Sequence, residues 1–196
     1  MKEILVVYAK PYNKEQKASV DIVRKVLKKY GSDNDFCERM ELSNRDFLKK
    51  DLCVVVGGDG TFLRASQFVE GVPLIGLNSD PKTKEGFYMR LNRLNFEKRF
   101  ENIFKGNFNT VNLTRLGAKI NNKPIHCRAL NEYYFGAEKS YMTSRYVITI
   151  SKPEAQRSSG VIVATPTGTR AWAKAIGAKV LPRDFKGYSY IVREPF

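Results

Sequence analysis

Strand patterns alternate with helix patterns through the first 81 residues, and this alternation constrains the fold more than any other feature of the chain. Residues 4–9 form a short apolar run rich in β-branched side chains, which predicts a buried strand. A helix is predicted from about Lys14 to Tyr30, because Asn13 can cap its start, apolar residues follow at helical spacing and Gly31 can end it. Strands that alternate with helices favour a parallel sheet covered by helices on both faces.

The pattern changes after residue 108. Before this point, further strands are predicted at 52–56 and 72–77, and a helix at 95–105. After it come a predicted hairpin turn at Asn121-Asn122 and strand-like runs at 146–150, 161–164 and 188–192. We therefore expect an α/β protein, with a doubly wound, Rossmann-like domain over residues 1–108 and a mostly β domain over residues 109–196.

The charge of the chain is large and uneven. The net charge is +14 over 196 residues. Residues 1–81 hold 13 Lys and Arg against 12 Asp and Glu, whereas residues 82–196 hold 21 against 8. The second half is therefore expected to face an anionic partner or to be simply solvated. The candidate partners are nucleic acid, a membrane surface and a polyphosphorylated small ligand, and the charge gives the sign of the partner but not its identity. Nucleic acid is not expected, because no basic stripe with interleaved aromatic residues and no known nucleic-acid module is present.

Cysteine and histidine usage excludes several kinds of site. Three widely spaced cysteines, Cys37, Cys53 and Cys127, argue against a disulfide framework and fit a reducing compartment. His126 is the only histidine, and we interpret it as an ordinary strand residue, so a dedicated zinc site is not expected. No apolar run is long enough to span a bilayer. A cytoplasmic protein that does not bind a membrane is predicted.

The strand at residues 52–56 runs into Gly57-Gly58-Asp59-Gly60-Thr61, the glycine loop, and a helix pattern follows. Glycines let the backbone approach a ligand and point N–H groups at phosphate oxygens, and the next helix N-terminus also favours an anion. The loop is neither a Walker A motif nor a dinucleotide fingerprint. Because a carboxylate repels phosphate, Asp59 is predicted to accept a hydroxyl proton or hold a metal ion. The alternative is a structural turn in which Asp59 caps the helix.

Four segments, in order, resemble the NAD kinase family. They are the glycine loop, which matches in full; the run from Gly76 to Pro81 with the later Gly86-Phe87; Ala129-Leu130-Asn131-Glu132; and the run from Gly160 to Thr169. The matches span roughly residues 50–180. Lipid kinases and phosphofructokinases carry similar glycine loops, so the ordered set makes the resemblance specific.

The resemblance implies transfer of a phosphoryl group from ATP or polyphosphate to the 2′-hydroxyl of the adenosine ribose of NAD, giving NADP. Asp59 would be the catalytic residue, accepting the proton or orienting the hydroxyl. The phosphate- and nucleotide-binding residues would be Gly57, Gly58, Gly60, Thr61, Arg64 and Asn78. The NAD-binding residues would be Asn131, Glu132, Arg157, Ser159, Thr165, Thr167, Gly168, Arg170, Ala171, Trp172 and Ala175.

The resemblance also implies partners and cofactors. Magnesium or another divalent cation would accompany the donor, with no dedicated metal site, and the protein would form a homodimer or homotetramer. Two alternatives remain open: a catalytically impaired dinucleotide-binding sensor, and a lipid or sugar kinase that shares the glycine loop.

Two departures from the family pattern are expected to matter. Ser159 stands where the family has Asp before glycine, and Arg170 adds a positive charge in the second loop. We expect tighter phosphate contact and altered base selectivity as a result. Family members continue past Phe196, so the resemblance implies a short or C-terminally truncated member with an incomplete β domain.

Overall fold

The computed structural model describes residues 3–139 and 141–196. The chain divides into two compact units, Met1–Val111 and Asn112–Phe196, which we call the N-terminal unit and the C-terminal unit. A domain boundary near residue 108 stays a prediction. Within the described ranges, no helix has both the length and the apolar character that crossing a bilayer requires.

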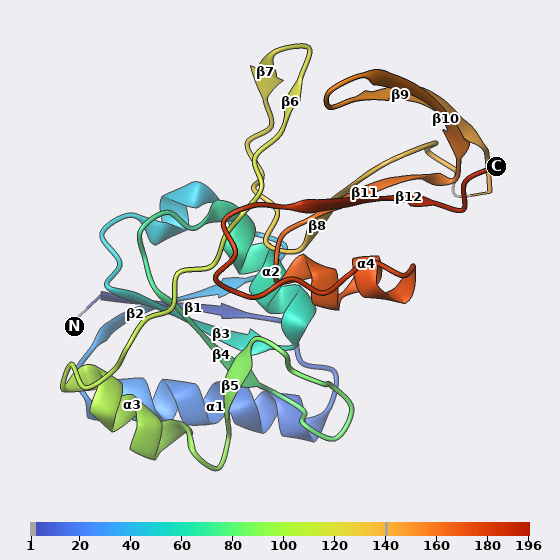
Figure 1. Ribbon diagram of the computed structural model, residues 1–196. Helices are drawn as coiled ribbons and strands as arrows, with labels where there is room; N and C mark the ends of the chain where they lie inside the picture. The colour runs from blue at the N-terminus through green and yellow to red at the C-terminus, as the bar shows by residue number, and fades with distance from the viewer. Residues whose placement is uncertain (1–2, 140) are drawn as a thin grey trace. The chain divides into compact units, whose positions relative to one another are not determined.

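The N-terminal unit is a parallel sheet between helices (Figure 1). Its strands are β1 (Glu3–Tyr8), β2 (Asp33–Glu38), β3 (Leu52–Gly57), β4 (Leu74–Asn78) and β5 (Met89–Asn92). Its helices are α1 (Lys14–Lys29), η1 (Asn44–Phe47), α2 (Asp59–Phe68) and α3 (Phe96–Phe104). The strands lie in the order β2-β1-β3-β4-β5, and every pairing is parallel. Because α1 and α3 cover one face and α2 the other, the predicted doubly wound fold is confirmed.

Sequence patterns explain most of these elements. All six residues of β3 are buried, as expected for a strand inside a parallel sheet. The side chain of Asn13 accepts a hydrogen bond from the backbone N–H of Gln16 at 2.9 Å and so caps α1, as predicted. Gly31 follows the helix with a φ of 63°, a conformation that glycine adopts without strain. Helix α3 buries Phe96 and Phe100 against the same core as α1.

Strand β2 was not predicted, because its sequence lacks an apolar run. It lies at the edge of the sheet, where β1 is its one partner among the strands that the structure describes, and its residues alternate between exposed and half-buried along the first four positions. Edge strands commonly carry polar side chains, which discourage pairing with other chains. The location of β2 therefore explains a composition that resembles a loop.

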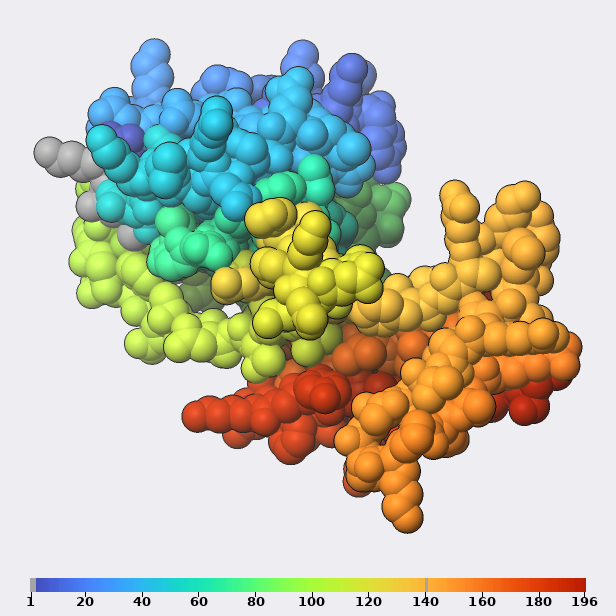
Figure 2. All heavy atoms as spheres, turned by 90° about the horizontal axis from the view of Figure 1, so that it is seen from above, coloured from blue at the N-terminus to red at the C-terminus, as the bar shows by residue number. Residues whose placement is uncertain are grey.

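The C-terminal unit is mostly β, as expected. Strands β8 (Glu132–Phe135), β11 (Gly160–Ala164) and β12 (Ser189–Arg193) form an antiparallel sheet in the order β12-β11-β8. Strands β9 (Ser144–Thr149) and β10 (Pro153–Ser158) form a long exposed ribbon, coloured orange in Figure 2. Two short helices, η2 (Gly168–Arg170) and α4 (Trp172–Ala175), follow β11.

The predicted hairpin turn in this unit is confirmed. Asn121 and Asn122 have φ values of 49° and 63° and connect β6 (Lys119–Ile120) to β7 (Lys123–Pro124). Two successive residues with positive φ form the kind of turn that joins two-residue hairpins, and asparagine tolerates this conformation well. The three predicted strands overlap β9, β11 and β12.

Candidate functional site

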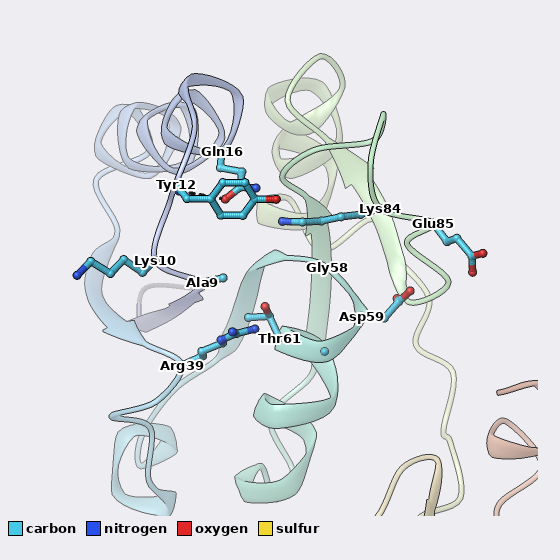
Figure 3. Close-up of a pocket in the computed structure, with 11 residues that line it drawn as sticks. Ala9, Lys10, Tyr12, Gln16, Arg39, Gly58, Asp59, Thr61, Lys84 and Glu85 are labelled. Atoms are coloured by element: carbon cyan, nitrogen blue, oxygen red, sulfur yellow. Dashed lines mark hydrogen bonds between the residues drawn. The ribbon is translucent and has the colours of Figure 1, made fainter. Parts of the chain in front are cut away.

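A cavity of about 420 Å³ lies at the carboxyl ends of the strands in the N-terminal unit. Strand β1 has β2 on one side and β3 on the other, so the chain changes direction across the sheet between β1 and β3. Crevices at such a switch point are the usual ligand sites of doubly wound sheets. The lining residues are Ala9, Lys10, Tyr12, Gln16, Arg39, Gly58, Asp59, Gly60, Thr61, Lys84 and Glu85 (Figure 3).

The glycine loop forms one wall of this cavity. Helix α2 begins at Asp59, directly after β3 and Gly58. The first N–H groups of a helix have no partner within the helix, and they carry the positive end of its dipole. A Cβ atom at Gly57 would lie 2.4 Å from Oγ1 of Thr61, so a side chain there is excluded, whereas one at Gly60 would meet open space. The loop therefore presents bare backbone to the cavity, which suits an anion such as phosphate.

The carboxylate of Asp59 is fixed by the segment that precedes β5. The backbone N–H groups of Phe87 and Tyr88 donate to its two oxygens at 2.9 and 2.8 Å. Asp59 is half-buried, and a carboxylate has about four acceptor positions, so both oxygens keep capacity for a further contact. Asp59 thus holds a second loop in place and borders the cavity.

The remaining predicted residues of the N-terminal unit divide into two groups. Thr61 lines the cavity and is almost fully buried. Asn78 and Arg64 do not line it. The amide of Asn78 donates to the carbonyl of Lys84 at 3.0 Å and accepts from the N–H of Asp80 at 3.0 Å. The guanidinium of Arg64 donates to Gln67 at 3.0 Å and lies 4.5 Å from the ring of Phe68.

Sequence reasoning missed several lining residues, including Gln16, Arg39 and Lys84. Figure 3 shows Lys84 reaching inward and Arg39 extending toward Thr61, while Lys10 points outward. One signal was available for Gln16. It stands at helical spacing before Val20, on the face that the apolar residues of α1 bury, and a polar side chain on such a face needs a reason. Arg39 and Lys84 lie at the cavity because of the order of the strands in the sheet, and the sequence patterns did not predict that order.

In the C-terminal unit, the structure brings the predicted Asn131-Glu132 and Thr165–Gly168 segments together. The N–H of Thr165 donates to the carbonyl of Asn131 at 2.8 Å, and Ala164 pairs with Glu132 across β11 and β8. A Cβ atom at Gly168 would lie 1.9 Å from the carbonyl oxygen of Asn131, so only glycine fits this approach. The two motifs form one packed cluster.

The hydroxyl groups of this cluster are used internally. The Oγ1 atoms of Thr165 and Thr167 donate to the carbonyl of Leu130 at 2.6 and 3.1 Å, and Thr165 Oγ1 accepts from the N–H of Gly168 at 2.9 Å. Both threonines are buried. Their observed contacts therefore stabilise the loop, while a ligand contact through either hydroxyl stays a prediction.

Glu132 is different, because its side chain is only partly satisfied. Its Oε2 atom is buried and, within the described residues, has no hydrogen-bond partner. Burial raises the pKa of this carboxyl above its ordinary value, because the charged form loses hydration. An orphaned acceptor on a half-buried acid is the kind of group that a hydroxyl donor can satisfy.

The other predicted dinucleotide residues lie around η2, α4 and the end of β10. The ring of Trp172 lies 5.3 Å from that of Tyr134, and the guanidinium of Arg193 lies 5.6 Å from the Trp172 centroid. Ala171 and Ala175 bound α4 on either side of this contact, and Arg170 donates to the carbonyl of Leu181 at 3.3 Å. Trp172 is 39% exposed, so part of its ring remains accessible.

Arg157 and Ser159 occupy the end of β10 and the residue after it. The guanidinium of Arg157 lies 4.6 Å from the ring of Phe196. The hydroxyl of Ser159 donates to the carboxylate of Glu194, which helps to hold the pKa of that carboxyl below its usual value. An acidic group thus lies beside Ser159, supplied by another part of the chain.

Comparison with known proteins gives the family. Residues 3–108 match the family model described as the ATP-NAD kinase N-terminal domain. A probable NADH kinase of Oryza sativa subsp. japonica is 28% identical over 91% of this chain and 62% of its own length. An NAD kinase of Fusobacterium nucleatum subsp. nucleatum is 27% identical over 89% of this chain and 64% of its own length. The chain therefore spans somewhat less than two thirds of these relatives.

Two solved structures share the fold. Yeast NADH kinase complexed with NADH superposes with a TM-score of 0.83 at 18% identity, covering 100% of this chain and 63% of that one. An NAD kinase from Archaeoglobus fulgidus in complex with ATP gives a TM-score of 0.75 at 22% identity, covering 99% and 73%. At these identities the likeness concerns the fold alone. Because the family model matches more than half of the residues, the chain belongs to the NAD kinase family.

Proposed function

We propose that this protein is an NAD kinase that transfers a phosphoryl group from ATP or polyphosphate to the 2′-hydroxyl of the adenosine ribose of NAD, giving NADP. The observation that carries the proposal is the cavity at the β1/β3 switch point, where the bare glycine loop and the start of α2 adjoin a fixed carboxylate. Family membership and the NAD and NADH kinases among the relatives support the reaction class.

The proposed chemistry needs positioning more than covalent catalysis. The 2′-oxygen attacks the terminal phosphorus of the donor, the bond from that phosphorus to the bridging oxygen breaks, and the nucleoside diphosphate or shortened polyphosphate leaves. Asp59 accepts the hydroxyl proton or orients the hydroxyl, using acceptor capacity that Phe87 and Tyr88 leave unused. The N–H groups of the glycine loop bind phosphate oxygens.

We propose that a divalent cation, Mg²⁺, binds together with the phosphates of the donor. Among the described residues, no three His, Cys, Asp or Glu side chains gather into a metal-binding group. Mg²⁺ commonly binds through one or two carboxylates together with substrate phosphates and water. Asp59 fits this requirement as the fixed carboxylate of the cavity wall. The ion would neutralise charge on the transferring phosphate.

The dinucleotide is proposed to bind residues of the C-terminal unit. Glu132 has a buried oxygen that can accept from a ribose hydroxyl, and Trp172 has an accessible ring that can stack on a base. Asn131 adjoins Glu132 on the same strand end. We also propose that the protein is cytoplasmic. A further proposal is that it forms a homodimer or homotetramer, and size-exclusion chromatography with light scattering would measure the number of subunits.

The test is an assay of the purified chain with NAD or NADH, Mg²⁺ and either ATP or tripolyphosphate, coupled to an NADP-specific dehydrogenase. NADP formation that Asp59→Asn reduces by at least about 100-fold would support the proposal. Glu85→Gln is the matched control, because Glu85 also borders the cavity but points outward in Figure 3. Binding of NAD without turnover with any donor would contradict it and favour a dinucleotide sensor.

A further inference from the structure

The aliphatic stem of Lys84 lies against the glycine loop. A Cβ atom added at Gly58 would lie 3.0 Å from Cδ of Lys84 and 3.6 Å from its Cγ. Because Gly58 has no side chain, the stem packs directly on the backbone. The ammonium group is thereby carried across the loop toward Tyr12, as Figure 3 shows.

The ammonium group of Lys84 is hydrogen-bonded to a neutral hydroxyl and, in the part of the chain that the structure describes, not to a carboxylate. Nζ of Lys84 donates to Oγ of Ser79 at 2.9 Å and lies 6.0 Å from the centroid of the Tyr12 ring. An ammonium group has three N–H donors, so capacity remains for a ligand. Lys84 forms no ion pair with a carboxylate of the described residues. Asp80, which feels the charge of Lys84, is bonded to Asn13 instead.

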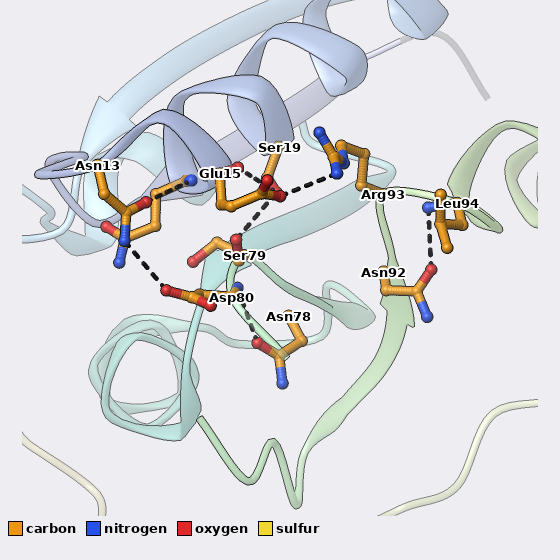
Figure 4. A network of polar contacts seen from close by, with 10 residues as sticks. Asn13, Glu15, Ser19, Asn78, Ser79, Asp80, Asn92, Arg93 and Leu94 are labelled. Carbon is orange, nitrogen blue, oxygen red and sulfur yellow. Dashed lines mark hydrogen bonds and ion pairs between the residues drawn. The ribbon is translucent and has the colours of Figure 1, made fainter. Parts of the chain in front are cut away.

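The segment that carries Lys84 is tied to its surroundings at several points (Figure 4). Asn78 bonds the carbonyl of Lys84 at 3.0 Å and the N–H of Asp80 at 3.0 Å. Asn13, the cap of α1, donates to Asp80 at 3.1 Å, and Ser19 donates to the carbonyl of Ser79 at 3.1 Å. Lys84 is thus positioned before any ligand binds, and this lowers the entropic cost of binding.

A second donor lies in the same cavity wall. Gln16 is 2% exposed, and its Nε2 atom is buried without a hydrogen bond to any described residue, although the amide lies near enough to Asp80 to help lower the pKa of that carboxyl. Its Oε1 atom accepts from the N–H of Tyr12 at 3.4 Å, which orients the amide. Buried donors without partners are rare, and one that lines a cavity indicates a ligand acceptor.

We propose that Lys84 and Gln16 bind the phosphate chain of a substrate in this cavity. The ammonium of Lys84 contacts non-bridging phosphate oxygens, and Nε2 of Gln16 donates to one of them. The inference rests on the proposed function and adds two binding residues to it. The same chemistry belongs to the phosphates of ATP or polyphosphate and to the pyrophosphate of NAD, so the experiment separates these sources.

The experiment compares Lys84→Met with Lys82→Met. Lys82 is exposed in the same segment and does not line the cavity, so its substitution controls for net charge. Calorimetry would measure affinities for tripolyphosphate, ATP and NAD, and the coupled assay would measure KM and kcat. Lys84→Met is expected to weaken binding of one phosphate source by about 10- to 100-fold, the effect of losing a hydrogen bond to a charged group. Lys84→Arg should recover most of it, and Gln16→Met should lose about 2- to 10-fold.

Each result decides the proposal. A selective rise in KM for ATP or tripolyphosphate supports it with the donor as the source, and a selective rise for NAD supports it with the dinucleotide. Equal affinities in Lys84→Met and Lys82→Met, with melting temperatures matching the parent protein, would overturn it. Because tripolyphosphate binding needs no turnover, an inactive parent that binds it through Lys84 would refute only the kinase proposal. An active parent indifferent to Lys84 would refute only this inference.

Discussion

The two units use their polar groups in opposite ways. In the N-terminal unit, a large apolar core supports a cavity edge where Lys84 and Gln16 keep unused hydrogen-bond capacity. In the C-terminal unit, the buried core is small, and the hydroxyls of Thr165 and Thr167 help to hold the unit together. Among the described residues predicted to bind the dinucleotide, only Glu132 has a buried side-chain atom that lacks a partner, its Oε2, whereas the cavity edge of the N-terminal unit keeps two donors for a ligand.

The largest expected effect tests the difference between the two cores. Phe100 is fully buried among Tyr30, Phe96 and Phe104, so Phe100→Ala should lower the free energy of unfolding by about 3–5 kcal/mol in urea titrations. Ile162→Ala, in the smaller core, should cost about 2 kcal/mol. Leu94→Ala, at a residue that is 90% exposed, should change stability by no more than about 0.5 kcal/mol. Equal costs for Phe100 and Ile162 would break the comparison.

Glycine substitutions probe how closely each ligand loop is packed. Gly168→Ala should lower the unfolding free energy by about 1–3 kcal/mol, because its Cβ would overlap the backbone carbonyl of Asn131. Gly60→Ala should be neutral or stabilising by up to about 1 kcal/mol, because its Cβ meets open space in the first turn of α2. Thermal melts of both variants give the measurement. A destabilised Gly60→Ala would mean that the glycine loop is packed as tightly as its counterpart.

The role of the threonines can be separated by shape-matched changes. Thr165→Val removes a buried hydroxyl that bonds both Leu130 and Gly168, and should lower stability by about 1–3 kcal/mol. Thr165→Ser keeps the hydroxyl and should lose about 1 kcal/mol or less. Urea unfolding measures the stability, and calorimetry with NAD measures the affinity. A stable valine variant that no longer binds NAD would assign the hydroxyl to the ligand.

The smallest effect concerns the pH dependence of Glu132. Burial raises the pKa of this carboxyl in the folded state, so its stabilising contribution is present below the unfolded pKa and is lost as pH rises through the folded value. Glu132→Gln should therefore melt at a higher temperature than the parent at neutral pH, and the difference should shrink toward pH 4. Melting curves between pH 4 and 8 measure it. A constant difference across this range would show that ionisation of Glu132 does not affect folding.

The sequence predicted elements whose signals are local. Asn13, the apolar spacing of α1 and Gly31 mark that helix completely, and the buried run of β3 leads to the glycine loop. Strand β2 escaped prediction because an edge strand need not be apolar. For the same kind of reason, the internal bonds of Thr165 could not be foreseen, since they depend on how β8 and β11 pair.

The candidate site was predicted in part. The motif identified the glycine loop and Asp59, which border the cavity, whereas Arg64 and Asn78 contact their own neighbourhoods. Lys84 lies outside the matched motif residues, and its place beside Gly58 results from the adjacency of β3 and β4. Contacts made by strand order are invisible to patterns read along a single chain.

The two hydrogen bonds that Asp59 accepts from backbone N–H groups have a consequence for any mutational test of its chemistry. The side chain that would contact the 2′-hydroxyl of the substrate also holds the segment from Lys84 to Tyr88 in place. Asp59→Asn places an NH₂ group opposite a backbone N–H, so one of these two hydrogen bonds is lost. The segment should then become more mobile and Lys84 less well positioned, at the same time as turnover falls. The loss of activity would then combine the loss of the catalytic carboxylate with the displacement of Lys84. The affinity of the same variant for tripolyphosphate separates the two contributions.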